Sequence, residues 1–199
     1  MMRIIAGTAR GRRLAAPKGT ATRPTSDRAR EGLFATVTAI RGPLPGARVL
    51  DLFAGSGAIG LEALSRGAAR VVFVESDPQA ARVIRANLAA VALPGGELVC
   101  DQVRRFLDRG PAAEAAFDLV VADPPYAASV DGVTGMLTAL ACGAWLAPGA
   151  LVAVERATRA GPFPWPARYR ADRSRRYGEA TFWYGLAAAE ASQGKGVTA

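Results

Sequence analysis

Two short motifs hold the residue types that a group-transfer reaction needs. The first is the glycine-rich turn Gly55-x-Gly57-x-x-Gly60, which follows an apolar run ending at Phe53. Glycine residues let a backbone approach a ligand closely, because they lack a Cβ atom. Glu75 ends the next apolar run, at the spacing of a carboxylate that binds ribose hydroxyls. The turn predicts a cofactor with a nucleoside part, and a glycine turn without a ligand is the alternative.

Asp51, just ahead of this turn, favours one cofactor over another. A dinucleotide would place its pyrophosphate on the turn, where the Asp51 carboxylate would repel it. S-adenosyl-L-methionine has no phosphate and carries an ammonium and a sulfonium group, which the same carboxylate attracts. We therefore expect S-adenosyl-L-methionine as the cofactor, S-adenosyl-L-homocysteine as the product, and no metal.

The third apolar run is followed by Asp101-Gln102-Val103, where the adenine ring of such a cofactor would lie. A side chain or the backbone there would reach the adenine amino group. The residues leave open whether Asp101 or Gln102 points inward, and either could instead cap a helix.

The second motif is Asp123-Pro124-Pro125-Tyr126, directly after the apolar run 117–122. Two prolines fix the backbone, so that its carbonyls and the Asp123 carboxylate present acceptors in set directions. Tyr126 offers a flat face on which a heterocyclic base can stack. Such acceptors suit a planar exocyclic amine, whose methylation depends on in-line placement. We expect these four residues to be catalytic, and a rigid turn is the alternative.

These motifs need a fold that brings the ends of several strands together. Apolar runs alternate with helical patterns, which predicts a mostly parallel sheet covered on both faces. Ligands of such sheets bind beyond the carboxyl ends of the strands, near the point where strand order reverses. The expected strands are 48–53, 70–75, 97–100, 117–122, 150–155, 169–177 and 180–186. The expected helices are 26–40, 58–65, 78–91, one ending near 108, and 130–141.

The two last strands face each other across Gly178 and predict an antiparallel hairpin that completes a seven-stranded sheet. At the other end of the chain, residues 3–7 and 12–15 predict a short hairpin around residues 8–11.

Composition excludes several kinds of chemistry. The 199 residues contain no histidine, which excludes Ser-His-Asp and Cys-His catalysis and any His-ligated metal site. Hydrophobic residues make up 50% of the chain, enough to build a core.

The formal net charge of +8 is unevenly placed. Residues 1–30 carry eight basic residues against Asp27 alone, and residues 156–199 carry eight against three acidic ones. The middle, residues 31–155, has nine basic and thirteen acidic residues. Basic ends around an acidic middle predict a polyanionic partner, with nucleic acid the first choice. A merely solvated basic surface is the alternative.

The two cysteines, Cys100 and Cys142, each follow apolar residues, and we expect buried, inert thiols. The first residues form too short an apolar run for a signal peptide, and no stretch approaches the ~20 apolar residues of a membrane helix. We expect a cytoplasmic, monomeric protein that does not contact a membrane.

Taken together, Asp51-x-Phe53-Ala54-Gly55-Ser56-Gly57 and Asp123-Pro124-Pro125-Tyr126 resemble the motifs of class I methyltransferases that act on amino groups. The segment Arg23-Pro24-Thr25-Ser26-Asp27-Arg28 is similar to the bacterial 16S rRNA guanine-N2 methyltransferases of the RsmD type. The likeness continues through residues 60–67 and Val154-Glu155, to about residue 187. It implies a Rossmann-like α/β fold and methylation of N2 of one guanine, in the small ribosomal subunit or its assembly intermediate.

The resemblance also implies roles for single residues, with residues 123–126 at the target base. Cys100-Asp101-Gln102 departs from the family's usual small-residue and acidic pattern, which leaves the adenine contact open. The cofactor-binding residues that it implies are Asp51, Phe53, Ala54, Gly55, Ser56, Gly57, Glu75, Ser76, Asp101, Gln102, Val103 and Asp123. The residues expected to bind RNA are Arg3, Arg10, Arg12, Arg13, Arg23, Thr25 and Arg28. The expected division is a basic extension (1–25), a methyltransferase domain (26–187) and a flexible tail (188–199).

Three other functions stay open. A protein-amide methyltransferase usually has Asn in place of Asp123 and would not need the basic ends. A nicotinamide dehydrogenase would leave Asp51 and the 123–126 motif unexplained. A non-catalytic RNA-binding factor would need only the basic ends.

Overall fold

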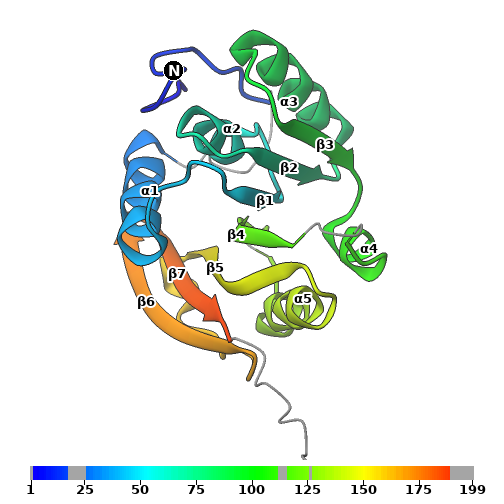
Figure 1. Ribbon diagram of the computed structural model, residues 1–199. Helices are drawn as coiled ribbons and strands as arrows, with labels where there is room; N and C mark the ends of the chain where they lie inside the picture. Colours follow the sequence, from blue (N-terminus) through cyan, green and yellow to red (C-terminus); the bar gives the residue numbers. More distant parts are fainter. Residues whose placement is uncertain (1, 18–25, 112–115, 126, 189–199) are drawn as a thin grey trace, which may run out of the picture.

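The computed structural model describes residues 2–17, 26–111, 116–125 and 127–188, and its strands form one seven-stranded sheet (Figure 1). The strand order is β3-β2-β1-β4-β5-β7-β6. The strands are β1 (Arg48–Leu52), β2 (Arg70–Glu75), β3 (Gly96–Cys100), β4 (Phe117–Ala122), β5 (Leu146–Ala157), β6 (Tyr169–Tyr177) and β7 (Ala180–Ala187). The helices are α1 (Asp27–Arg41), α2 (Ala58–Ser65), α3 (Pro78–Val91), α4 (Val103–Asp108) and α5 (Val130–Cys142), with a 3-10 turn, η1 (Thr158–Ala160).

Strands β1 to β5 are parallel, and β7 runs antiparallel to both of its neighbours, β5 and β6. The chain builds β1, β2 and β3 outward and then returns to the other side of β1 with β4. The order therefore reverses between β1 and β4, where Leu52 pairs with Ala122. The predicted α/β sheet, mostly parallel with a C-terminal antiparallel hairpin, is confirmed.

Helices α1, α2 and α3 pack on one face of the sheet, and α4 and α5 pack on the other (Figure 1). Alternation along the strands divides the core between the two layers, with Val49 in the first and Leu50 in the second. Helix α1 begins at its predicted cap, because the Ser26 hydroxyl accepts a hydrogen bond from the Ala29 N–H.

The predicted N-terminal hairpin forms only in part. Arg3 and Arg13 make an isolated antiparallel bridge, and no regular strand follows on either side of it within residues 2–17. The reason is that the N–H groups of Ile5 and Ala6 donate to the buried carboxylate of Glu62 on α2, at 2.7 and 2.9 Å. The hairpin is thereby fixed to the sheet's first helical layer. The expected domain boundaries stay predictions, since residues 18–25 and 189–199 lie outside the described part of the chain.

Two expectations are wrong. Both cysteines are exposed, although their apolar neighbours predicted burial. Cys100 ends β3, which is an edge strand with little cover, and Cys142 ends α5. Strand β5 is also longer than the expected 150–155. Over the described residues, no helix has the length and apolar character to span a bilayer.

Candidate active site

The candidate site lies at the carboxyl ends of β1 and β4, where the strand order reverses. The chain leaves β1 through the glycine turn and leaves β4 through Asp123, whose N–H donates to the Leu52 carbonyl at 3.3 Å. The two motifs are far apart in sequence, and the parallel pairing of β1 with β4 places them side by side.

The glycine turn is shaped for close approach. Gly55 and Gly57 have φ angles of 56° and 77°, in the left-handed region that favours glycine. A Cβ atom on Gly55 would have only the Phe53 carbonyl oxygen near it, at 4.0 Å, so the turn is open on that side. Asp51 supports the turn, since its carboxylate accepts a hydrogen bond from the Gly60 N–H at 2.9 Å.

Glu75 ties the ends of β1 and β2 together. One of its carboxylate oxygens accepts from the Gly55 N–H at 2.7 Å, and the other accepts from the Asp77 N–H at 2.8 Å. Asp77 in turn caps α3 by accepting from the N–H groups of Gln79 and Ala80. A carboxylate held in this way is positioned before any ligand binds, and its remaining lone pairs can accept from ribose hydroxyls.

Four carboxylates share one face of the sheet at this edge. Asp51 pairs with Phe73 and Val121, and Val121 pairs with Ala153. Because side chains alternate along a strand, the residues two positions further on in β2, β4 and β5 face the same side. The resulting row consists of Asp51, Glu75, Asp123 and Glu155.

Burial and the neighbouring carboxylates disfavour the charged forms of Asp51 and Asp123. Burial, followed by the charge of Glu75, raises the pKa of Asp51 to about 8, against a lowering contribution from the Gly60 hydrogen bond. The pKa of Asp123 is raised well above its usual range by burial and then by the charges of Glu155 and Asp51. A cation bound here would reverse the effect by stabilising the carboxylates. Among the described residues, no group of three or more carboxylates or thiols is arranged to hold a metal ion.

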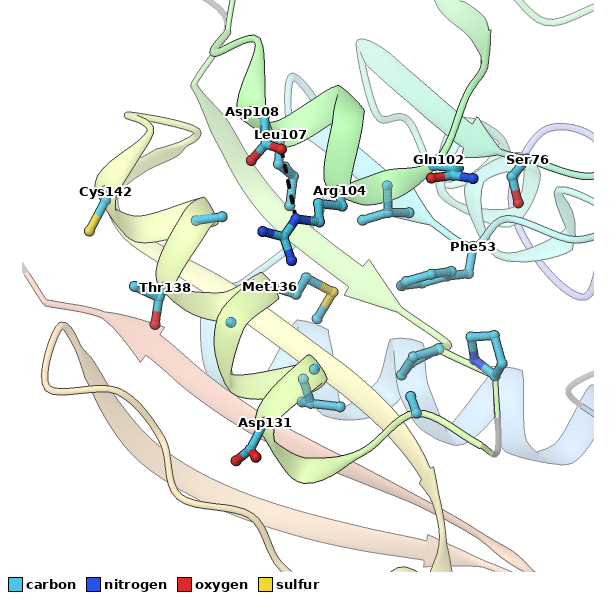
Figure 2. A pocket seen from close by; sticks show the side chains of 18 residues that line it. Phe53, Ser76, Gln102, Arg104, Leu107, Asp108, Asp131, Met136, Thr138 and Cys142 are labelled. Carbon is cyan, nitrogen blue, oxygen red and sulfur yellow. Dashed lines mark ion pairs between the residues drawn. The ribbon is translucent and has the colours of Figure 1, made fainter.

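On the other face of the sheet, a cavity of about 710 Å³ opens between α4 and α5 (Figure 2), and the four carboxylates of the row are not among its lining residues. Phe53, Ser76 and Gln102 lie together at one end of it, and Val103, Pro124 and Pro125 also line it. The predicted cofactor residues that follow three different strands thus meet at one cavity.

Asp101 and Gln102, between which the sequence did not decide, have different positions. The Asp101 carboxylate pairs with the Arg109 guanidinium at 2.7 Å and accepts from the Gln102 N–H. Gln102 lines the cavity and precedes the first turn of α4, making no side-chain capping bond. The structure therefore presents Gln102 to a ligand in the cavity.

The expected cofactor, S-adenosyl-L-methionine, fits this donor set. A positively charged methionine portion would meet Asp51 and the other buried carboxylates, a ribose would meet Glu75, and an adenine would enter the cavity beside Phe53. A pyrophosphate would meet the same carboxylates and be repelled. The chemistry of the donor set thus favours the cationic cofactor over a dinucleotide.

The second motif is described in part. Pro124 is buried and Pro125 is exposed, and the Pro125 carbonyl accepts from the Ala128 N–H at 2.7 Å. That bond occupies one acceptor of the loop, whereas the Asp123 carboxylate faces the carboxylate row. Tyr126 lies outside the described residues.

The arginines expected to bind RNA differ in their surroundings. Arg10, Arg13 and Arg28 are exposed, and the Arg3 guanidinium lies 3.9 Å from Asp27. Arg12 is also exposed, but its guanidinium is held against the end of α3, because it donates to the carbonyls of Ala90 and Val91 at 2.9 and 2.8 Å. Arg23 and Thr25 lie outside the described part.

Glu155 is the residue of this site for which the sequence analysis assigned no role. It is 4% exposed and follows the buried residues of β5. The sequence did contain a signal for Glu155. Like Asp123, Glu155 directly follows an apolar run that ends at the carboxyl edge of the parallel sheet.

Comparison with known proteins identifies relatives of this chain in sequence and in structure. Residues 2–185 match the family described as Conserved hypothetical protein 95. The chain is 34% identical over 181 residues to Ribosomal RNA small subunit methyltransferase D of Escherichia coli strain K12, covering 91% of this chain and 87% of that protein. It is 36% identical over 156 residues to the protein of that name from Haemophilus influenzae, covering 77% of this chain and 78% of the other. The solved structure of yhhF from Escherichia coli superposes with a TM-score of 0.80 at 32% identity, covering 95% of this chain and 99% of that one.

Proposed function

This chain belongs to the Conserved hypothetical protein 95 family, with the ribosomal RNA small subunit methyltransferases D, and we propose that it methylates N2 of one guanine in 16S rRNA. The observation that carries the proposal is Asp123, a half-buried acceptor beside a glycine turn in a chain with these relatives. The substrate is the small ribosomal subunit or its assembly intermediate, in the cytoplasm, and the protein acts as a monomer.

The cofactor is S-adenosyl-L-methionine, which supplies an electrophilic methyl group when it is bound. Asp51 and the glycine turn hold its charged portion, Glu75 binds the ribose, and Gln102 and Val103 border the adenine. Ser76 and Phe53 complete the cavity on that side. These assignments rest on the donor set and the position of each residue at the carboxyl edge of the sheet.

The residues of the second motif position the target base. A guanine leaves its stack and lies against Tyr126, at a cost of a few kcal/mol that stacking and phosphate contacts offset. The Asp123 carboxylate and the Pro124 carbonyl accept the N2 hydrogens, which directs the nitrogen lone pair at the methyl group. Asp123 would accept the proton that N2 loses on methylation.

The test is mass mapping of rRNA methylation after incubation of the protein with labelled cofactor and unmodified small subunits. We expect one methyl group on one guanine, located at N2. Asp123→Ala should abolish transfer while cofactor binding, measured by calorimetry, stays near that of the wild type. Near-normal transfer by Asp123→Ala would rule out the assigned role.

Two further measurements separate the alternatives. Calorimetry should show binding of S-adenosyl-L-methionine and none of NAD, whereas the reverse result would indicate a dehydrogenase. Tyr126→Ala should lower turnover of the subunit substrate, and an unchanged rate would exclude stacking on Tyr126.

A further inference from the structure

Strand β6 carries a group of arginines with little compensation by acidic residues. Arg170, Arg173, Arg175 and Arg176 are all exposed on this strand. Arg173 pairs with its neighbour Asp172, the one acidic residue of the strand, and the Arg176 guanidinium donates to the Gly178 carbonyl at 2.9 Å. The β6 arginines are therefore a strongly cationic element on a chain whose middle is acidic.

The sheet register places one end of β6 level with the candidate site. Arg175 pairs with Phe182, which pairs with Glu155, and the next row joins Arg176, Thr181 and Arg156. Since β5 is parallel to β4, this row lies at the carboxyl edge of the sheet, where Asp123 follows β4. Three strand spacings, roughly 15 Å, separate the backbone of Asp123 from that of Arg175.

Helix α1 joins this end of β6 to the N-terminal hairpin. A Cβ atom on Gly32 would lie 2.2 Å from the Tyr177 ring, so that α1 packs directly on the end of β6 (Figure 1). One turn earlier, α1 exposes Arg28, and Asp27 lies 3.9 Å from Arg3 of the hairpin. Exposed cations thus continue from the hairpin, across the start of α1, to the β6–β7 turn.

An alternative explanation for these charges is that they prevent the edge strand from pairing with other chains, which is a common role of charged residues at sheet edges. That role requires charge along the free edge, and it does not require the charge to continue onto a neighbouring helix at the level of the active site. Arginine also binds phosphate in a planar, two-pronged geometry, and phosphate contacts fix the register of a nucleic acid.

We propose that the end of β6, through Arg175 and Arg176, is a second RNA-contacting surface that binds phosphates flanking the target base. The proposal rests on the proposed function, in that the partner is the same rRNA. It adds a contact on the side of the site opposite the cofactor strands β2 and β3, so that the backbone is held on both sides of the displaced base.

The test compares Arg175→Ala/Arg176→Ala with Arg82→Ala/Arg85→Ala, which removes the same charge from exposed positions on α3. We expect the β6 variant to bind unmodified small subunits about tenfold or more weakly at low salt. The slope of log affinity against log salt concentration should become shallower by roughly 1–2, while the α3 variant follows the wild type. Affinity of the β6 variant for S-adenosyl-L-methionine should stay unchanged, because the cofactor strands β2 and β3 lie on the other side of the site.

A photo-crosslinking residue at the exposed position Ser174 identifies the partner. Crosslinks to rRNA support the proposal, whereas crosslinks only to a ribosomal protein would overturn it. An affinity and a salt slope equal to those of the wild type would also overturn it. Failure of the proposed function has a different signature, because the wild-type protein itself would then transfer no methyl group to rRNA.

Discussion

In its proposed role Asp123 must be ionised to take up the proton that the target amine loses, yet burial and two neighbouring carboxylates raise its pKa well above the usual range. The proton is therefore held at the pH where most aspartates have lost it. A positively charged cofactor beside Asp51 would favour ionisation, because its charge opposes the repulsion within the row. Under the proposed function, the ionisation of Asp123 would therefore depend on whether the cofactor is bound.

The first prediction concerns the pH dependence of methyl transfer. A raised pKa means that the carboxylate form of Asp123 is lost as pH falls, so the single-turnover rate should rise with pH. Glu155→Gln removes one negative neighbour and should shift the midpoint of this rise to lower pH, with the plateau at high pH retained. The measurement is the single-turnover rate between pH 5 and 9 with saturating cofactor.

Asp123→Asn is the control, since it keeps the shape of the side chain without the titrating group. The rate of this variant should be lower than that of the wild type by at least about a hundredfold, and it should not follow the same pH profile. If Glu155→Gln leaves the midpoint unchanged, Glu155 does not act on Asp123 electrostatically.

For single residues, the sequence predicted those of the two motifs better than it predicted the residues around them. Asp51 and Asp123 are visible because each adjoins a motif with a recognisable pattern. Glu155 has no such neighbour, and its place beside Asp123 follows from the pairing of β4 with β5. The choice between Asp101 and Gln102, which the sequence left open, likewise depends on Arg109, whose position no local pattern gives.

Helix α2 is short and fully buried. It directly follows the glycine turn, and its Glu62 binds the N-terminal hairpin. Gly60 allows this helix to lie close to β2, because a Cβ atom there would be 2.2 Å from the Phe73 ring and 2.8 Å from Val71. Gly135 on α5 presents the opposite situation, with nothing within 4 Å of an added Cβ.

The second prediction therefore compares two identical substitutions. Gly60→Ala should lower the free energy of unfolding by about 1–3 kcal/mol, because the added methyl group overpacks the core. Gly135→Ala should raise it by about 0.5–1 kcal/mol, since alanine restricts the unfolded chain and favours the helix. Urea denaturation measures both, and equal effects of the two substitutions would contradict the packing described here.

The third prediction separates the arginines of the N-terminal hairpin. Arg10, Arg12 and Arg13 are all exposed, but Arg12 also donates to two carbonyls at the end of α3. Arg12→Ala should lower the free energy of unfolding by about 1–2 kcal/mol, as expected for lost charge-assisted hydrogen bonds. Arg10→Ala and Arg13→Ala should leave stability within about 0.5 kcal/mol of the wild type and weaken binding of small subunits.

Urea denaturation and subunit binding assays distinguish these effects. Equal losses of stability in all three variants would show that the Arg12 contacts contribute nothing particular. Equal affinities for the subunit in the wild type and in the Arg10 and Arg13 variants would remove the hairpin from the RNA surface.

Local patterns predicted the elements of the fold well because several helices begin at clear signals, such as Ser26 before α1 and Asp77-Pro78 before α3. They did not predict which strand lies at an edge. Leu98-Val99-Cys100 has the composition of a buried strand, yet the order of the sheet leaves β3 with one neighbour and Cys100 exposed. Exposure of an apolar strand is decided by the whole sheet and not by its own sequence.

In the whole molecule, negative and positive charges lie at different depths. Acidic groups gather in the buried row at the carboxyl edge, and exposed arginines lie at both ends of the chain around it. The arrangement suits two ligands of opposite charge, a cationic cofactor inside and a polyanion outside. It also carries a cost in the absence of the cofactor, because buried carboxylates that lose their protons repel one another without compensation.

The fourth prediction follows from that cost. The folded protein holds the Asp51 proton up to a pKa of about 8, whereas the ordinary value is 3.8. Between these values the unfolded chain has lost a proton that the folded chain keeps. The free energy of unfolding must therefore fall as pH rises through this interval and level off above pH 8. Asp51→Asn removes this dependence, so that the cofactor-free variant should be more stable than the wild type at pH 8.5, by on the order of 2 kcal/mol.

Calorimetric melting at pH 6 and pH 8.5, with and without S-adenosyl-L-methionine, measures both sides of this balance. Without cofactor, Asp51→Asn should melt roughly 4–8 °C above the wild type at pH 8.5, and the difference should shrink at pH 6. With cofactor the order should reverse, because the wild-type carboxylate gains a cationic partner that the amide cannot bind equally well. A different result would contradict this account: Asp51→Asn would be destabilised at both pH values, and the cofactor would raise its melting temperature as much as that of the wild type. In that case Asp51 would serve only to hold the Gly60 N–H, and the charge of the carboxylate row would have no part in cofactor binding.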